Sequence, residues 1–118
     1  MAAGAHDIIM EQGSTFNRTF TLKDDDEVVI DISGYRADMQ IRNDKEAVTT
    51  ILVCSTAGSY LTIPVGTDGV IELSVPASVT STLDFDIGVY DLETSTSAGV
   101  VVRLLEGNCT LSKEVTRQ

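Results

Sequence analysis

The sequence Phe85-Asp86-Ile87-Gly88-Val89-Tyr90-Asp91-Leu92-Glu93 is followed by a short connection, residues 94–98, and then by Gly99-Val100-Val101-Val102-Arg103-Leu104-Leu105-Glu106-Gly107. Both runs are rich in β-branched and aromatic residues, and the connection contains only Thr, Ser and Ala. Two such runs around a short polar connection are typical of a β-hairpin. The C-terminal third of the chain therefore predicts two antiparallel strands and, with them, an all-β fold.

Apolar and polar residues also alternate upstream of this hairpin. The alternation is unbroken in residues 35–42, and in residues 16–22 it is interrupted only at Arg18, which we expect at the edge of the apolar row. A period of two indicates a sheet with one buried and one solvent-exposed face. A register shift of one residue would expose all of the apolar side chains. Further strands are predicted at residues 7–11, 28–32, 47–53, 59–63 and 70–75.

Residues 76–83 are the one candidate helix. Pro76 suits the first helical position, and Val79 and Leu83 make an apolar pair at helical spacing. The many β-branched residues limit this helix to about two turns. Turn signals recur about every 8–12 residues, which is typical of a sandwich or small barrel. The sequence therefore predicts one domain over residues 1–118, an antiparallel β-sandwich of about eight or nine short strands with one short helical turn.

The composition limits the classes of partner. The chain has 118 residues and a formal net charge of -10, from 18 acidic and 8 basic residues. Binding to nucleic acid or to anionic lipid needs a basic surface, so we expect neither nucleic acid nor a membrane as partner. No apolar run approaches the roughly 20 residues of a transmembrane helix, and no signal peptide is visible at the N-terminus. Cys54 and Cys109 are too few for a disulfide framework, and we expect two free thiols in a protein made in a reducing cytoplasm.

Residues with catalytic or metal-binding potential are few. His6 is the one histidine and precedes the first predicted strand, where we expect it to be solvated. The acidic run 24–27 lacks the alternating oxygen ligands and central glycine of a calcium-binding loop, so a solvated turn is expected. Arg103 interrupts the apolar run 100–105, and Asp91 on the facing strand is its candidate partner. The sequence has no nucleophile–base motif and no metal-ligand spacing, so we expect no enzyme activity, no cofactor and no metal site.

Four ordered phrases cover nearly the whole chain. They are Ile9 to Phe16 (IMEQGSTF), Asp31 to Arg42 (DISGYRADMQIR), Gly69 to Thr80 (GVIELSVPASVT), and a closing set of Asp86 to Glu93 (DIGVYDLE), Val101 to Gly107 (VVRLLEG) and Val115 to Arg117 (VTR). Together they resemble a family of small virion structural proteins of tailed phages, common in marine and cyanobacterial phages and prophages. The entry phrase departs from the family pattern by one extra residue before Gln12.

The resemblance implies an Ig-like β-sandwich similar to the N-terminal module of phage baseplate upper proteins. It also implies a non-enzymatic virion building block, assembled in the bacterial cytoplasm as a homo-oligomer in the particle, with tail, baseplate or major capsid proteins as partners. A tail, baseplate or fibre-adaptor role is expected first, and a capsid decoration (cement) protein is the alternative. A carbohydrate-binding module is a weaker alternative, because the chain has no Trp, and Tyr35 and Tyr90 fall on rows that predict core.

The polar ends are predicted partner-binding arms, because a small domain without catalytic residues acts through contacts. The N-terminal arm is Met1, Ala2, Ala3, Gly4, Ala5 and His6, and the C-terminal arm is Lys113, Glu114, Val115, Thr116, Arg117 and Gln118. We expect the arms to lie free of the domain in the isolated chain. In the particle, one or both would then add as a strand to an exposed sheet edge of a neighbouring subunit.

Overall fold

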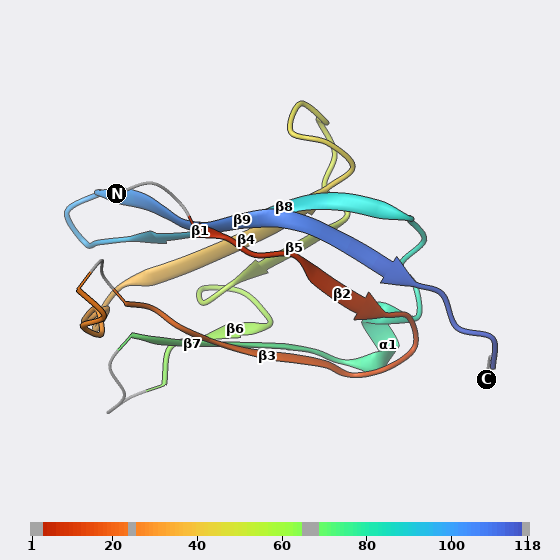
Figure 1. The fold of residues 1–118 in the computed structure, drawn as a ribbon, viewed down its shortest axis with the longest axis horizontal. Coiled ribbons are helices and arrows are strands. Elements are labelled where there is room, and N and C mark those ends of the chain that lie inside the picture. The colour runs from red at the N-terminus through yellow and green to blue at the C-terminus, as the bar shows by residue number, and fades with distance from the viewer. Residues whose placement is uncertain (1–3, 24–25, 65–68, 117–118) are drawn as a thin grey trace.

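Two β-sheets stacked face to face form the described part of the chain (Figure 1). The structure is a computed structural model that describes residues 4–23, 26–64 and 69–116. Its elements are β1 (Gly4–Ala5), β2 (Ile8–Glu11), β3 (Phe16–Thr21), β4 (Arg36–Arg42), β5 (Leu52–Ser55), β6 (Leu61–Thr62), β7 (Val70–Val75), α1 (Ala77–Thr80), β8 (Ile87–Ser95) and β9 (Val101–Ser112). The larger sheet has the order β1-β9-β8-β4-β5, with β2 also paired to β9, and the smaller sheet has the order β3-β7-β6. The predicted all-β sandwich is confirmed.

The predicted C-terminal hairpin is present and forms the centre of the larger sheet. β8 pairs antiparallel with β9 on one side and with β4 on the other. In this register Leu92 lies opposite both Met39 and Leu105, so the three side chains share the inner face of the sheet. A register shift after Leu92 marks a β-bulge.

The N-terminal strands differ from the antiparallel prediction. The strand predicted at residues 7–11 is present as β2, but β1 and β2 both pair with β9 in parallel, Gly4 opposite Leu105 and Ile8 opposite Cys109. β2 leads through the turn at Gly13 into β3 of the other sheet. The direction of β2 is therefore fixed by this crossing between sheets, and it is the same as the direction of β9.

Two strand predictions need correction. Residues 28–32 form no strand; Val29 makes an isolated bridge to Lys23 while the chain crosses from the smaller sheet to the larger one. In this segment Ile32 is buried in the core and Val28 is exposed, although neither residue belongs to a strand. In residues 47–53 the chain joins the sheet only at Leu52, after a loop over residues 43–51. The strands predicted at 59–63 and 70–75 are present as β6 and β7, of which β6 has only two residues.

The helix α1 is shorter than predicted and closes one end of the sandwich beside the turn between β2 and β3 (Figure 1). Pro76 is its N-cap, in an extended conformation, rather than its first helical residue. Thr80 is fully buried; its hydroxyl donates to the carbonyl oxygen of Ser14 (2.8 Å) and accepts the N–H of Gly13 (3.1 Å). Tertiary hydrogen bonds therefore fix a helix that is too short to be stable alone.

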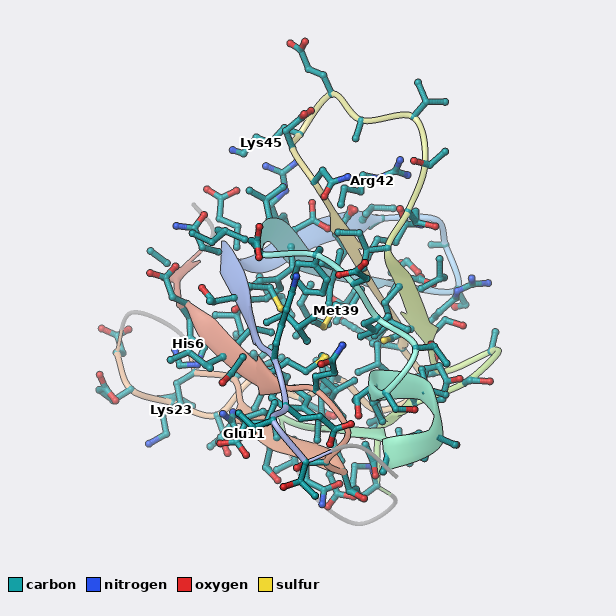
Figure 2. The ribbon with its side chains drawn as sticks, turned by 90° about the vertical axis from the view of Figure 1, so that its right-hand side faces the viewer. His6, Glu11, Lys23, Met39, Arg42 and Lys45 are labelled. Carbon is teal, nitrogen blue, oxygen red and sulfur yellow. The ribbon has the colours of Figure 1, made fainter. Side chains whose placement is uncertain are left out.

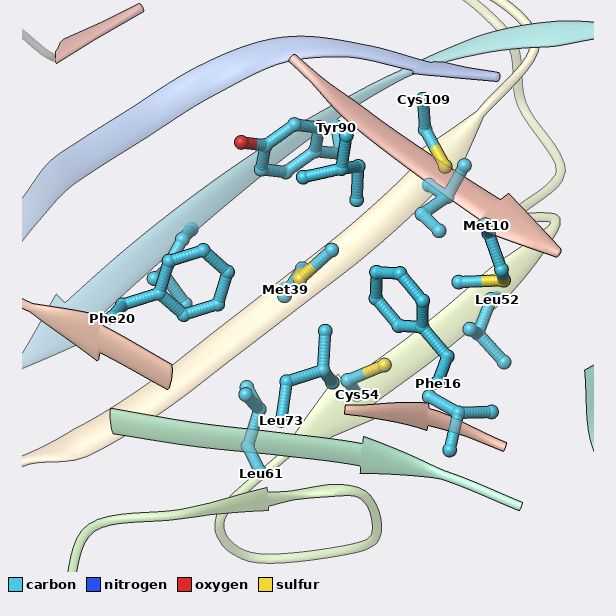
Figure 3. Close-up of a cluster of buried hydrophobic side chains, with 14 of the residues drawn as sticks. Met10, Phe16, Phe20, Met39, Leu52, Cys54, Leu61, Leu73, Tyr90 and Cys109 are labelled. Atoms are coloured by element: carbon cyan, nitrogen blue, oxygen red, sulfur yellow. The ribbon is translucent and has the colours of Figure 1, made fainter. Parts of the chain in front are cut away.

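The core lies between the sheets and combines aliphatic side chains with Phe, Met and Cys (Figure 3). Its labelled members are Met10, Phe16, Phe20, Met39, Leu52, Cys54, Leu61, Leu73, Tyr90 and Cys109. The predicted inward rows of β4 and β7 are confirmed, since Ala37, Met39 and Ile41, and also Ile71, Leu73 and Val75, are buried. Arg18, at the edge of the β3 row, is exposed and places its guanidinium 4.7 Å from the centre of the Phe16 ring.

Gly107 permits the close approach of the N-terminal segment to β9. A Cβ atom at position 107 would overlap the backbone of His6 and the carboxylate of Asp7. That carboxylate accepts the N–H of Asn108, the residue after the glycine, at 2.9 Å. The parallel edge of the larger sheet therefore requires a residue without a side chain at this position.

We predict that Gly107→Ala lowers the free energy of unfolding by about 1–3 kcal/mol, because His6 or β9 must move to make room. Urea denaturation measures the loss, and hydrogen exchange at the His6 amide reports whether the segment detaches. Gly4→Ala in β1 is the matched control, since its Cβ would meet the movable end of the Leu105 side chain at 3.3 Å and the Leu104 carbonyl oxygen at an ordinary contact distance of 3.7 Å. Equal losses in the two variants would contradict this role of Gly107.

Candidate contact surface

A groove of about 480 Å³ lies on the outer face of the larger sheet. Residues of β4, β8, β9 and the loop 43–51 line it. Because side chains alternate along a strand, the register that turns Met39 and Leu92 inward turns Asp38 and Glu93 outward. The groove and the core are therefore set by the same strand pairing.

Carboxylates of the groove lie directly opposite one another at two points. Asp38 of β4 is opposite Glu93 of β8, and Asp91 of β8 is opposite Glu106 of β9. Like charges in opposed cross-strand positions destabilise a sheet by roughly 0.2–1 kcal/mol per pair. An arrangement that opposes folding marks a candidate functional surface.

Two arginines offset part of this repulsion. Arg36 donates two hydrogen bonds of 2.9 Å to Asp38, and this pairing raises the pKa of Arg36. Arg103 lies 3.5 Å from Asp91 and 3.3 Å from Glu106, so the predicted pairing of Arg103 with Asp91 is confirmed. All of these pairs are solvent-exposed, and each contributes only about 0–1 kcal/mol to stability.

Arg42 holds the loop 43–51, which supplies one wall of the groove. Its guanidinium donates to the carbonyl oxygens of Ala47 (2.8 Å) and Val48 (3.0 Å). Figure 2 shows Arg42 and Lys45 at the base of this loop, where it projects from the sandwich. Lys45 also lines the groove. The loop therefore adds two cations to a face whose strands supply the carboxylates.

Two charges of the groove, of opposite sign, have no ion pair among the described residues. Arg42 donates to neutral oxygen atoms only. Glu93 lies opposite Arg103 of β9, but the Arg103 guanidinium pairs with Asp91 and Glu106, and no described Lys or Arg lies within ion-pair distance of Glu93. Glu106, by contrast, is approached by Lys45 at 3.9 Å in addition to Arg103. Arg42 and Glu93 are both half-buried and both line the groove.

Exposed aliphatic side chains flank the groove on the same outer face. Ile9 of β2 and Ile87 of β8 lie on either side of Thr110 and are 59% and 62% exposed. Val53 of β5 lies opposite Gln40 and is 49% exposed. Charged and aliphatic side chains held on paired strands form a surface suited to contact with another protein.

Of the residues in this face, the sequence singles out only Arg103 and Asp91. Asp38, Arg42 and Glu93 belong to the polar half of the alternating runs at 35–42 and 85–93, whereas Lys45 and Glu106 lie outside these runs. Which of them meet depends on the pairing of β4 with β8 and on the register of β8 with β9, and the hairpin pattern predicts only that β8 and β9 are neighbours.

The predicted N-terminal arm is not free of the domain. Gly4–Ala5 form β1, and His6 is fixed by two hydrogen bonds: its N–H donates to the Glu106 carbonyl oxygen at 2.9 Å, and its carbonyl oxygen accepts the Tyr90 hydroxyl. We call these two bonds, together with the close approach at Gly107, the N-terminal clamp. The prediction of a free arm is wrong for residues 4–6, because this segment completes the edge of its own sheet. Met1, Ala2 and Ala3 lie outside the described residues.

The C-terminal arm is anchored at its first two residues, so the prediction of a free arm is wrong for Lys113 and Glu114. Lys113 lies 3.1 Å from Asp84 and 3.4 Å from Asp86, and the hydrogen bond to Asp84 is the main reason why the pKa of Lys113 is raised. The N–H of Glu114 donates to the side chain of Gln12 (3.0 Å). The next two residues, Val115 and Thr116, are exposed, and Arg117 and Gln118 lie outside the described residues.

Cys54 and Cys109 are free thiols, as predicted, and both are buried in the core. Burial raises the pKa of each thiol from 9.0 to about 12. Burial also raises the pKa of Tyr90 to about 12, with a smaller contribution from Asp7, so its hydroxyl keeps the proton that it donates to His6.

The remaining predicted features lie away from the groove. The His6 ring is exposed, as predicted, and contacts Phe20 edge-on, with 6.3 Å between ring centres. Of the acidic run, Asp26 and Glu27 are exposed, and residues 24–25 lie outside the described part. No group of three or more His, Cys, Asp or Glu side chains within residues 4–23, 26–64 and 69–116 could hold a metal ion. Over the same ranges, no helix is long and apolar enough to cross a membrane.

No protein-family model matches this chain, and a comparison with curated proteins finds no significant match. The virion family named above, and the functions that it implies, therefore stay predictions.

We predict that the protein loses stability as the pH rises from about 8 to about 10.5. The pKa of each buried thiol and of Tyr90 is raised in the folded state, so the unfolded chain loses these protons first and unfolding is favoured. The melting temperature should fall by several degrees over this interval. A double variant, Cys54→Ala with Cys109→Ala, should start lower but show a smaller pH-dependent fall. Identical falls in both proteins would contradict the assignment, as would labelling of either thiol by a thiol reagent in the native protein at neutral pH.

Proposed function

We propose that this chain is a non-enzymatic structural protein of a tailed-phage virion that acts through contacts with other virion proteins. The observation that carries the contact role is the outer face of the larger sheet. There, charged side chains, including carboxylates in opposed cross-strand positions, are held on paired strands beside exposed aliphatic side chains. The assignment to a virion is supported by the four ordered phrases of the sequence.

A tail, baseplate or fibre-adaptor position is the first candidate, and a capsid decoration protein is the alternative. In a constant-type Ig sandwich the first, second, fourth and fifth strands form one sheet, and the third, sixth and seventh form the other. The orders β3-β7-β6 and β9-β8-β4 agree with this arrangement for the second to seventh strands, with β5 as an additional strand, and this supports the Ig-like assignment. The first strand differs, because β2 pairs with β9 of the other sheet. The carbohydrate-binding alternative loses support, because Tyr90 is buried and cannot stack on a sugar.

Quantitative mass spectrometry of gradient-purified particles tests the proposal. We expect this chain in the virions of the phage that encodes it, enriched over an abundant host cytoplasmic protein that serves as the contamination control. A copy number of a few to a few dozen per particle, referred to the major capsid protein, places the chain in the tail, and a copy number of hundreds places it on the head. Absence of the chain from purified particles would overturn the virion assignment.

The C-terminal arm yields a second test. Val115→Asp should leave the melting temperature unchanged, because Val115 is 93% exposed, and should lower incorporation into virions if the arm contacts a neighbouring subunit. Val28→Asp is the matched control, since it adds the same charge at a side chain that is 58% exposed and lies outside both the arm and the groove. Normal incorporation of the Val115 variant would count against a binding role for this arm.

A further inference from the structure

The net charge of the chain lies almost entirely outside the groove. The charged residues that line the groove, together with Arg36, comprise four of the eight basic residues and four of the eighteen acidic ones. The rest of the chain therefore carries the whole formal charge of -10. Two copies of this protein repel one another at most approaches, but not where groove meets groove. The charge distribution thus favours one mutual orientation of two copies.

The two unpaired charges of the groove are complementary between copies. Arg42 on β4 lies opposite Val89 on β8, and Glu93 lies four residues further along β8, between Asp38 on β4 and Arg103 on β9. Within one chain, residues so far apart along the strands cannot pair. In a two-fold dimer, a contact between residue i and residue j occurs twice, because j of the first copy also meets i of the second. A single symmetric arrangement can therefore pair both Arg42 residues with both Glu93 residues.

We propose that two copies of this chain associate face to face through the outer faces of their larger sheets, with Arg42 of each copy paired to Glu93 of the other. The two-fold axis lies in the plane of the interface and crosses the midpoint between these residues, over Gln40 and Asp91. Asp91 is paired with Arg103, which offsets part of the repulsion between the two Asp91 carboxylates at this centre. The dimer does not depend on the virion assignment, because it is measured on the isolated chain.

The aliphatic side chains at the margin add to this interface. Ile87 and Val53, on β8 and β5, point from the same face as Arg42 and Glu93 and are 62% and 49% exposed in the monomer. Covering them removes apolar surface from water, which contributes about 25 cal/mol per Å² buried. The opposed carboxylates Asp38 and Glu93 acquire a role as well, since a cation from the second copy relieves the repulsion between them.

Sedimentation equilibrium of the purified protein tests the proposal with two charge reversals that change the net charge equally. Glu93→Arg places like charges at both symmetric contacts and should weaken dimerisation at least about tenfold. Glu72→Arg is the matched control on β7, exposed on the outer face of the smaller sheet. It should leave dimerisation unchanged or strengthen it, because it reduces the overall repulsion. If overall charge alone mattered, both variants would dimerise more tightly than the original chain, and that result would overturn the proposal.

A mixing experiment tests the pairing itself. Arg42→Glu places two carboxylates at each contact and should also be monomeric, whereas an equimolar mixture with the Glu93→Arg variant should form a heterodimer, because both contacts are then of opposite sign. Thermal melts confirm that each variant is folded; if the Arg42 variant is not, the opposite responses of Glu93→Arg and Glu72→Arg still decide. A chain that stays monomeric at all concentrations, or a mixture of folded variants that does not associate, would refute the proposed dimer.

Discussion

The antiparallel pairing of β8 with β4 and β9 is the constraint on which the rest of the structure depends. Met39, Leu92 and Leu105 meet on the inner face of the sheet only in this register. Because side chains alternate, the same register brings Asp38 to Glu93, and Asp91 to Glu106, on the outer face. A shift of one residue would relieve both carboxylate pairs but would expose the core row, and burial of large side chains outweighs repulsion between solvated charges.

The edges of this central unit are completed by segments that come from elsewhere in the chain. At β9 the N-terminal clamp adds a parallel strand, which requires the bare backbone of Gly107 and uses the Tyr90 hydroxyl as a buried donor. At the end of the sandwich, Thr80 ties α1 to the turn between β2 and β3. Each of these contacts joins residues far apart in sequence. The sandwich is therefore closed by a few specific hydrogen bonds placed around a continuous apolar core.

The inner and outer faces of the larger sheet have opposite effects on the stability of the fold. The inner face supplies the stability that allows the outer face to carry charges in unfavourable positions. The repulsion on the outer face is small beside the burial of the core. It is confined to defined positions, and two charges of this face, Arg42 and Glu93, have no ion pair within the described chain. A second protein with complementary charges can pair with Arg42 and Glu93 and can cover the exposed aliphatic side chains. This is the physical basis of the proposed contact role.

The sequence by itself determined the all-β class, the hairpin of β8 and β9, and the inward rows of β4 and β7. These features follow from a period of two, which can be recognised in a short segment without knowledge of its tertiary contacts. The sequence also determined the free buried thiols and the pairing of Arg103 with Asp91 across adjacent strands. Only the tertiary structure decided that residues 28–32 cross between the sheets and that Gly4 to His6 bind in parallel to β9. Alternation records which side chains are buried, but not which strand lies beside which, and the groove exists only through that pairing.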